Sequence, residues 1–233
     1  MNDFTDAIDF IFSERDSPAG GTRVGGLGQI WELMWPHLKL SGAALGIACV
    51  IAIPLGLWLG HRGRGGFLAI NASNIGRAVP SLALIAFFVA WIGVGFANLT
   101  LALVLLAIPP ILTNTYTGVR QVDRDTVDSA RGMGMTGAQV VRRVELPLAL
   151  PLVFGGIRTS AVNVVATATI APLAGVVTLG DPIINVNTYG DEGRLAAAIV
   201  VALLAVATEV VLGTAQRAVT PRGLRVNRRE AVT

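Results

Sequence analysis

The sequence is poor in charged residues, lysine and cysteine. Only 14% of its 233 residues are charged, whereas a soluble domain usually carries about 25%. Lys39, its one lysine, precedes Leu40, which excludes the phosphate-binding loop that ends in Lys-Ser or Lys-Thr. A single cysteine, Cys49, excludes a disulfide within the chain. His37 and His61 lie far apart, so we expect no metal site and no catalytic residue.

Apolar runs long enough to cross a bilayer account for most of the chain. A membrane span needs about 20 predominantly apolar residues. Five runs have this character, at residues 38–59, 67–92, 99–119, 148–176 and 195–212. We therefore predict an all-α integral membrane protein with five transmembrane helices. Pro109 and Pro110 are expected to break the third helix, because proline removes a backbone donor.

The same runs divide the chain into three parts. We expect an N-terminal segment at 1–36, a transmembrane domain at 37–217 with a polar loop at 123–147, and a basic tail at 218–233. Within the first part, Phe4, Ile8, Ile11 and Phe12 recur at helical spacing, which predicts a short helix at the membrane surface. A frayed acidic tail is the alternative. The glycine-rich stretch 18–28 is expected to be a flexible loop.

The basic residues are distributed unevenly over the loops. With five spans, twelve arginines fall on one side of the membrane and four basic residues on the other. The first side holds Arg62, Arg64, Arg120, Arg124, Arg131, Arg142, Arg143, Arg217, Arg222, Arg225, Arg228 and Arg229, and the second holds Arg15, Arg23, Lys39 and Arg194. Because positive loops stay in the cytoplasm, the N-terminus is predicted outside and the C-terminus inside.

One polar segment between spans, residues 127–147, has a regular pattern. Asp128-Ser129-Ala130 is followed after three residues by Gly134, then after nine more by Val144, and Leu146-Pro147 closes the segment. This order predicts a short helix starting near Asp128, a turn allowed by glycine, a second short helix and a proline stop. A polar segment between spans must lie in water, so we expect a compact helical protrusion that docks on a cytoplasmic protein.

The glycines of this segment do not indicate a dinucleotide-binding site. The glycines at positions 132, 134 and 137 match the pattern G-x-G-x-x-G. That pattern binds a cofactor only after a strand within a βαβ unit, whereas here an arginine-rich polar turn precedes it and membrane spans flank it. The glycines are expected to permit a sharp turn.

The segment resembles the EAA loop of bacterial ABC importer permeases, whose pattern is E-A-A, three residues, G, nine residues, I-x-L-P. Asp128 stands for Glu, Ser129 for the first Ala and Val144 for Ile, and the spacing is intact. The residues that the resemblance assigns to ATPase coupling are Asp128, Ser129, Ala130, Arg131, Gly132, Met133, Gly134, Met135, Val144, Leu146 and Pro147.

The sequence around the segment is similar to that of osmoprotectant permeases for glycine betaine, carnitine and choline. The similar stretches are Val-Glu-Leu-Pro-Leu-Ala-Leu-Pro and Gly-Gly-Ile-Arg-Thr. The resemblance implies a type I ABC importer permease fold with cytoplasmic coupling helices, a location in the bacterial inner membrane and a role in osmoregulation. It implies a cytoplasmic ATPase dimer, a second permease subunit, identical or paralogous, and an external substrate-binding protein. The ATPase would use ATP and Mg²⁺; this chain would bind no cofactor, catalyse no reaction and contact no nucleic acid.

Polar groups inside the spans allow two readings. The uncharged set could line a translocation path or join helices through hydrogen bonds, and comprises Asn71, Asn74, Asn114, Asn163 and Thr167. The charged set is Arg77, Arg158 and Glu209. Charges in a membrane are costly unless they are paired or wet, so we expect Glu209 to pair with Arg158 or Arg77, the alternative being arginines that extend to the interface.

The resemblance leaves the transported solute open. A compatible solute such as glycine betaine, choline, carnitine or proline betaine is the first expectation, and methionine is the alternative cargo. Two tyrosines and four tryptophans make an aromatic cage for a quaternary ammonium improbable, so specificity is expected in the external protein. A membrane enzyme or receptor that needs no ATPase is the alternative from another class.

Overall fold

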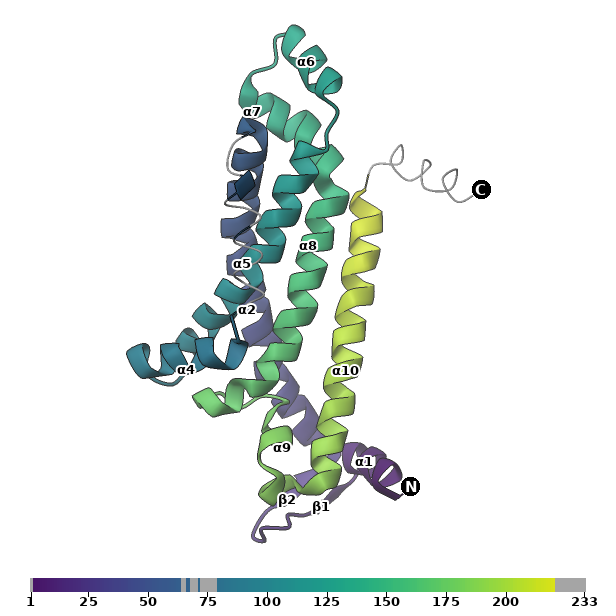
Figure 1. Ribbon diagram of the computed structural model, residues 1–233. Helices are drawn as coiled ribbons and strands as arrows, with labels where there is room; N and C mark the ends of the chain where they lie inside the picture. The colour runs from purple at the N-terminus through teal and green to yellow at the C-terminus, as the bar shows by residue number, and fades with distance from the viewer. Residues whose placement is uncertain (1, 64–65, 68–70, 72–78, 221–233) are drawn as a thin grey trace. The chain divides into compact units, whose positions relative to one another are not determined.

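A computed structural model describes residues 2–63, 66–67, 71 and 79–220, which are mainly helical (Figure 1). A short antiparallel hairpin pairs Glu14 with Gly25 and Asp16 with Arg23. In chain order the elements are α1 (Asn2–Phe12), β1 (Glu14–Asp16), β2 (Arg23–Gly25), α2 (Gly26–Arg62), α4 (Ser81–Ile92), α5 (Phe96–Arg120), α6 (Arg124–Gly132), α7 (Gly137–Val140), the π-helix η1 (Val141–Glu145), α8 (Leu146–Thr167), the 3-10 helix η2 (Ala168–Ala174), α9 (Asp181–Ile184) and α10 (Val186–Val219).

Four helical stretches are long and apolar enough to cross a membrane. They are α2, α5, the continuous run Gly137–Ala174 and α10. Large apolar side chains along them stay exposed, for example Val50 at 74% and Leu203 at 64%, as expected of faces that meet lipid. The predicted second span, 67–92, is interrupted by residues outside the described ranges, at 68–70 and 72–78, and the helix described within it, α4, has only 12 residues. Five spans therefore remain a prediction.

Two local predictions are wrong. Pro109 and Pro110 lie inside α5, which runs unbroken from Phe96 to Arg120. Long apolar segments on both sides keep this helix together, and an unpaired carbonyl can be satisfied locally in a span. The expected loop at 18–28 instead contains β2 and the start of α2. Gly25 and Gly26 have φ of 92° and 79°, values that let the chain turn directly from strand into helix.

Contacts divide the chain into two compact units, and each long helix contributes residues to both. Unit 1 comprises Met1–Leu45, Val79–Val104 and Ala161–Thr208, and unit 2 comprises Gly46–Ala78, Leu105–Ser160 and Glu209–Thr233. In unit 1 the helix predicted from the N-terminal spacing is present as α1. Its Ala7 and Phe10, both fully buried, pack with Val24, Tyr189 and Ala196.

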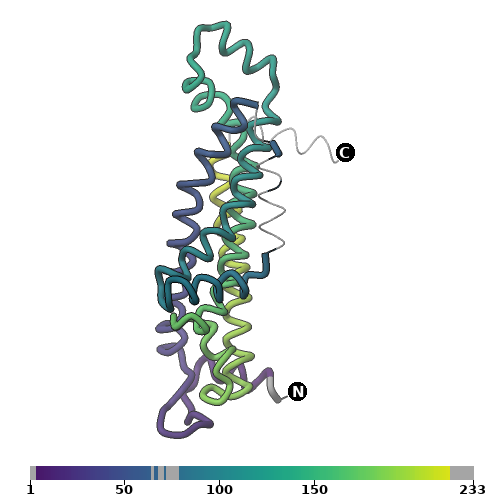
Figure 2. Tube along the Cα trace, turned by 60° about the vertical axis from the view of Figure 1, so that its left-hand side comes forward, coloured from purple at the N-terminus to yellow at the C-terminus, as the bar shows by residue number. Residues whose placement is uncertain are grey.

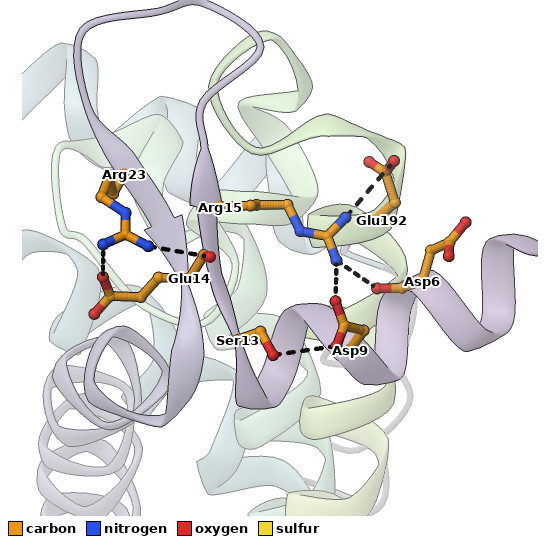
Figure 3. A network of polar contacts seen from close by, with 7 residues as sticks. All are labelled: Asp6, Asp9, Ser13, Glu14, Arg15, Arg23 and Glu192. Carbon is orange, nitrogen blue, oxygen red and sulfur yellow. Dashed lines mark hydrogen bonds and ion pairs between the residues drawn. The ribbon is translucent and has the colours of Figure 1, made fainter.

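Polar contacts of unit 1 add to this packing (Figure 3). The Arg15 guanidinium donates to the Asp9 carboxylate and to the Asp6 carbonyl, both at 3.1 Å, and lies 3.9 Å from a Glu192 carboxylate oxygen. The Ser17 hydroxyl donates to the Thr188 carbonyl at 2.7 Å. Exposed ion pairs contribute only about 0–1 kcal/mol each, so apolar burial holds α1 in place more than charge does.

In unit 2, small residues let helices approach closely. A Cβ built on Gly56 would lie 2.7 Å from the Thr115 Cβ, and one on Gly60 would lie 2.7 Å from the Val119 Cβ. Gly56 and Gly60 are spaced as in the G-x-x-x-G pattern, which brings helix backbones together in membranes. A second cluster follows on α5 and α8, where Val119 packs with Ala149 and Val153. This packing joins α2, α5 and α8 within unit 2.

Candidate functional site

The polar segment between α5 and α8 begins with the helix α6. Asp123 caps its N-terminus, where one carboxylate oxygen accepts the backbone N–H groups of Asp125 at 2.7 Å and Thr126 at 3.2 Å. A helix starting near Asp128 was expected, and this detail is wrong, because the capping carboxylate lies five residues earlier. Asp128 lies in the second turn instead, 3.6 Å from the Arg131 guanidinium.

A glycine turn and a second short helix follow, as the pattern predicted. Gly134 has φ of +85°, and the Met135 N–H donates to the Ala130 carbonyl at 3.2 Å, which ends α6 with a left-handed residue. Thr136 and Gln139 then form a capping box, each side chain bonded to the other's backbone N–H. These local bonds cap α6 at both ends and α7 at its N-terminus.

The end of the segment differs from the expected proline stop. Val141–Glu145 form a π-helix, in which the Leu146 N–H bonds to the Val141 carbonyl, and α8 continues from it without a break. Pro147 lies in the first turn of α8, where its missing N–H and fixed φ are tolerated. A push on this segment would therefore act on a continuous helical connection to a predicted span.

A histidine–carboxylate contact fastens this segment to α2. His61 Nδ1 lies 2.8 Å from a Glu145 carboxylate oxygen, and the Glu145 residue is only 4% exposed. A Cβ built on Gly137 would lie 3.2 Å from His61 Nε2, so the imidazole lies between α7 and η1. Sequence reasoning missed both residues as a site. The available signals were a histidine at the end of one apolar run and a lone carboxylate at the start of another.

The outer surface of the segment presents apolar and basic groups together. Met133 is 73% exposed, whereas Ala130 and Val140 are buried against the rest of unit 2. Arg142 and Arg143 are exposed on η1. Figures 1 and 2 both show α6 and α7 beyond the ends of the helices that they connect. Such a protrusion offers a flexible apolar side chain, methionine, beside charges that can contact carboxylates on a protein partner.

The predicted intramembrane charges are partly brought together, in unit 2. The Arg158 guanidinium forms an ion pair with Glu209 through Nη2 and donates through Nη1 to the Gln216 side-chain oxygen at 2.7 Å. The Gln216 amide in turn donates to the Pro151 carbonyl at 2.8 Å. One of the two pairings that the sequence allowed is thus present, beside a cavity of about 780 Å³. Arg77 lies outside the described residues.

The uncharged path candidates are not gathered into one site by the described contacts. The Asn71 amide donates to the Phe67 carbonyl at 2.7 Å, and the Asn114 amide donates to the Pro110 carbonyl of α5 at 2.8 Å. Asn163 is exposed on α8, and Thr167 is that helix's last residue. Asn74 lies outside the described residues. A role of these groups in translocation stays a prediction.

Across 2–63, 66–67, 71 and 79–220, no three His, Cys, Asp or Glu side chains are grouped as a metal site would require. The paired His61 and Glu145 are two possible ligands, one or two fewer than a protein zinc site uses.

Comparison with known proteins places this geometry in a family. Residues 52–225 match the family described as the binding-protein-dependent transport system inner membrane component. The chain is 40% identical over 189 residues to the glycine betaine/carnitine/choline transport system permease protein OpuCB of Bacillus subtilis, covering 81% of this chain and 87% of that one. It is 39% identical over 198 residues to the choline transport system permease protein OpuBB of the same organism, covering 84% and 91%.

A solved structure supports the fold. A chain of the MetNI methionine ABC transporter, in an inward-facing conformation, superposes with a TM-score of 0.71, covering 84% of this chain and 98% of that one at 21% identity. This likeness concerns the fold alone. The family match spans most of the chain, including the whole segment between α5 and α8. The chain therefore belongs to the family of inner membrane components of binding-protein-dependent transport systems.

Proposed function

We propose that this chain is the permease subunit of an ATP-driven importer for a small compatible solute such as glycine betaine, choline, carnitine or proline betaine. Two relatives at about 40% identity are permeases of glycine betaine, carnitine and choline systems, and their likeness extends over four fifths of the chain. The methionine transporter shares the fold at only 21% identity, which favours the compatible-solute reading over methionine.

The single observation that carries this proposal is the protrusion formed by α6, α7 and η1. These elements act as coupling helices: they dock on a cytoplasmic ATPase dimer and transmit its closure to α8 through the unbroken η1–α8 connection. The sequence contains no phosphate-binding loop of the Lys-Ser or Lys-Thr type, so ATP and Mg²⁺ would be used by the ATPase. The external substrate-binding protein delivers the solute, and a second permease subunit, identical or paralogous, completes the path.

We also propose that the chain has five transmembrane spans, with the N-terminus outside and the C-terminus in the cytoplasm. Residues 1–36 would lie outside the cytoplasm and 218–233 inside, while 37–217 form the transmembrane part, although α2 already begins at Gly26. A path lined by Asn71, Asn114 and Asn163 would offer uncharged polar groups that pass a zwitterion or a quaternary ammonium ion without trapping it.

The test is capture of the ATPase together with solute uptake. Met133→Asp places a charge on the most exposed apolar residue of the segment, and we expect less co-purified ATPase and slower uptake of labelled glycine betaine. Gln121→Asp is the matched control, because Gln121 is exposed in the turn before α6. Unlabelled choline, carnitine and methionine compete in separate assays to define the cargo. A tagged wild-type chain that captures no ATPase would overturn the proposal.

A further inference from the structure

A second, strongly basic cavity lies in unit 2 beneath α6. Its volume is about 420 Å³, and it is formed where the C-terminal ends of α2 and α5 meet α6 and η1. Five basic side chains line it, against two carboxylates. The basic residues are His61, Arg62, Arg120, Arg124 and Arg131, and the acidic ones are Asp128 and Glu145.

Both carboxylates already have partners. Glu145 is bonded to His61 at 2.8 Å, and Asp128 lies 3.6 Å from Arg131. Three arginines then remain for which no carboxylate lies within ion-pair distance in the described part of the chain. They are Arg62, Arg120 and Arg124. The four arginines and two carboxylates of the lining give a net charge of +2 without counting His61.

The positions of these arginines leave their donors available. The Arg62 guanidinium stacks over the Trp58 ring, 4.5 Å from its centroid, which uses its face and not its N–H groups. Arg120 Nη1 lies 3.0 Å from the point where a Gly63 Cβ would stand, so the side chain is folded against the end of α2. Arg124 is the first residue of α6. All three arginines line the same cavity, and an anion between them would reduce the repulsion among their charges.

We propose that this cavity binds a phosphate group. Guanidinium groups present forked N–H donors that match phosphate oxygens in pairs, and three of them can surround one phosphate. The cavity lies where the apolar helices α2 and α5 end, which is the depth of lipid head groups. The phosphate can thus belong to an anionic lipid or be free in solution, and the same residues would bind either.

The test titrates the full-length chain, purified in an uncharged detergent, with inorganic phosphate and separately with short-chain phosphatidylglycerol. Calorimetry is expected to show saturable binding of at least one of them. Arg120→Gln with Arg124→Gln should weaken binding about tenfold or more, because charge-assisted hydrogen bonds are lost. Arg142→Gln with Arg143→Gln is the matched control, since these arginines belong to the same segment but do not line the cavity.

The outcomes of the titrations identify the ligand or overturn the proposed site. Binding of the lipid alone assigns the site to a head group, and binding of phosphate alone assigns it to a soluble ligand. No binding of either, or equal weakening in both double variants, overturns the proposal. If the Arg120/Arg124 double variant loses ATPase capture although the wild-type chain binds neither probe, the arginines dock on protein and the proposal is wrong.

A measurement on the wild-type chain covers the case in which the variant fails to fold. Phenylglyoxal modifies accessible arginines, and mass spectrometry locates the products. The bound probe should protect Arg120 and Arg124 while leaving Arg142 reactive. Equal modification with and without the probe contradicts the site, whatever the variants do.

Discussion

At the scale of single residues, Glu145 is a buried carboxylate that depends on one partner. Its carboxylate is buried at the start of α8's helical connection, and His61 is its partner at 2.8 Å. When a buried carboxylate loses its partner, the free-energy cost of removing it from water is no longer offset. This cost is larger than the net contribution of the hydrogen bond itself. His61 and Glu145 therefore depend on each other more than their single contact suggests.

We predict that His61→Ala lowers the free energy of unfolding by about 1–3 kcal/mol, because it leaves Glu145 unpaired. His61→Gln should recover part of the loss, since its amide can donate to the carboxylate. Thermal unfolding of the purified chain measures the stability, and labelled-solute uptake measures the coupling of the segment to α2.

Arg142→Ala serves as the control for this prediction. Arg142 is exposed on η1, three residues before Glu145, and exposed charges contribute little to stability. A His61→Ala protein as stable as the Arg142→Ala protein would show that the histidine contact does not hold the segment.

At the scale of helices, α2 and α5 approach each other closely at Gly60. Gly60→Leu would place a side chain where a Cβ already meets the Val119 Cβ at 2.7 Å. We expect a loss of about 1–3 kcal/mol from overpacking, seen as a lower unfolding temperature in detergent. Gly46→Leu is the matched control on the same helix, because a Cβ there meets nothing within 4 Å. Equal stability of the two variants would refute the close packing.

The polar link between α8 and α10 allows a charge exchange. Arg158→Glu and Glu209→Arg should each abolish most transport, because each leaves two like charges in contact within a span. The double variant should recover part of the activity, since the Gln216 amide offers both a donor and an acceptor to either arrangement. Uptake measured at matched membrane levels decides, and a double variant no better than the single ones contradicts the pairing.

The segment between α5 and α8 shows how far the spacing of residues predicts helices and turns. The pattern around Gly134 gave two short helices and the turn between them, because a left-handed residue strongly favours glycine. It misplaced the start, because Asp123 and Asp128 are equally good caps and only the three-dimensional course of the chain selects Asp123. Pro147 could not be assigned either, since proline stops a helix in one register and begins one in another.

At the scale of the whole molecule, the length of the apolar runs predicted most of the long helices. It did not predict which side chains join them. Four of the five expected spans are present as long helices. The contacts that join helices, such as Glu145 with His61 and Arg158 with Gln216, link residues 84 and 58 positions apart. A single sequence contains the side chains of such pairs but not their distance, so neither of these two pairs was predicted. The pairing of Arg158 with Glu209 was predicted as one of two alternatives.

Topology supplies the last prediction, at the same scale. Twelve arginines on one side against four basic residues on the other predict that α6 lies in the cytoplasm and the β1–β2 hairpin outside. In a Cys49→Ser background, Ala19→Cys introduces one exposed thiol in the hairpin, and Met133→Cys introduces one in the segment between α5 and α8. A membrane-impermeant maleimide added to intact cells should label the first and not the second. Permeabilised cells, where both thiols should react, provide the control. Labelling of Met133→Cys in intact cells would reverse the predicted orientation and leave the segment between α5 and α8 on the side without ATP.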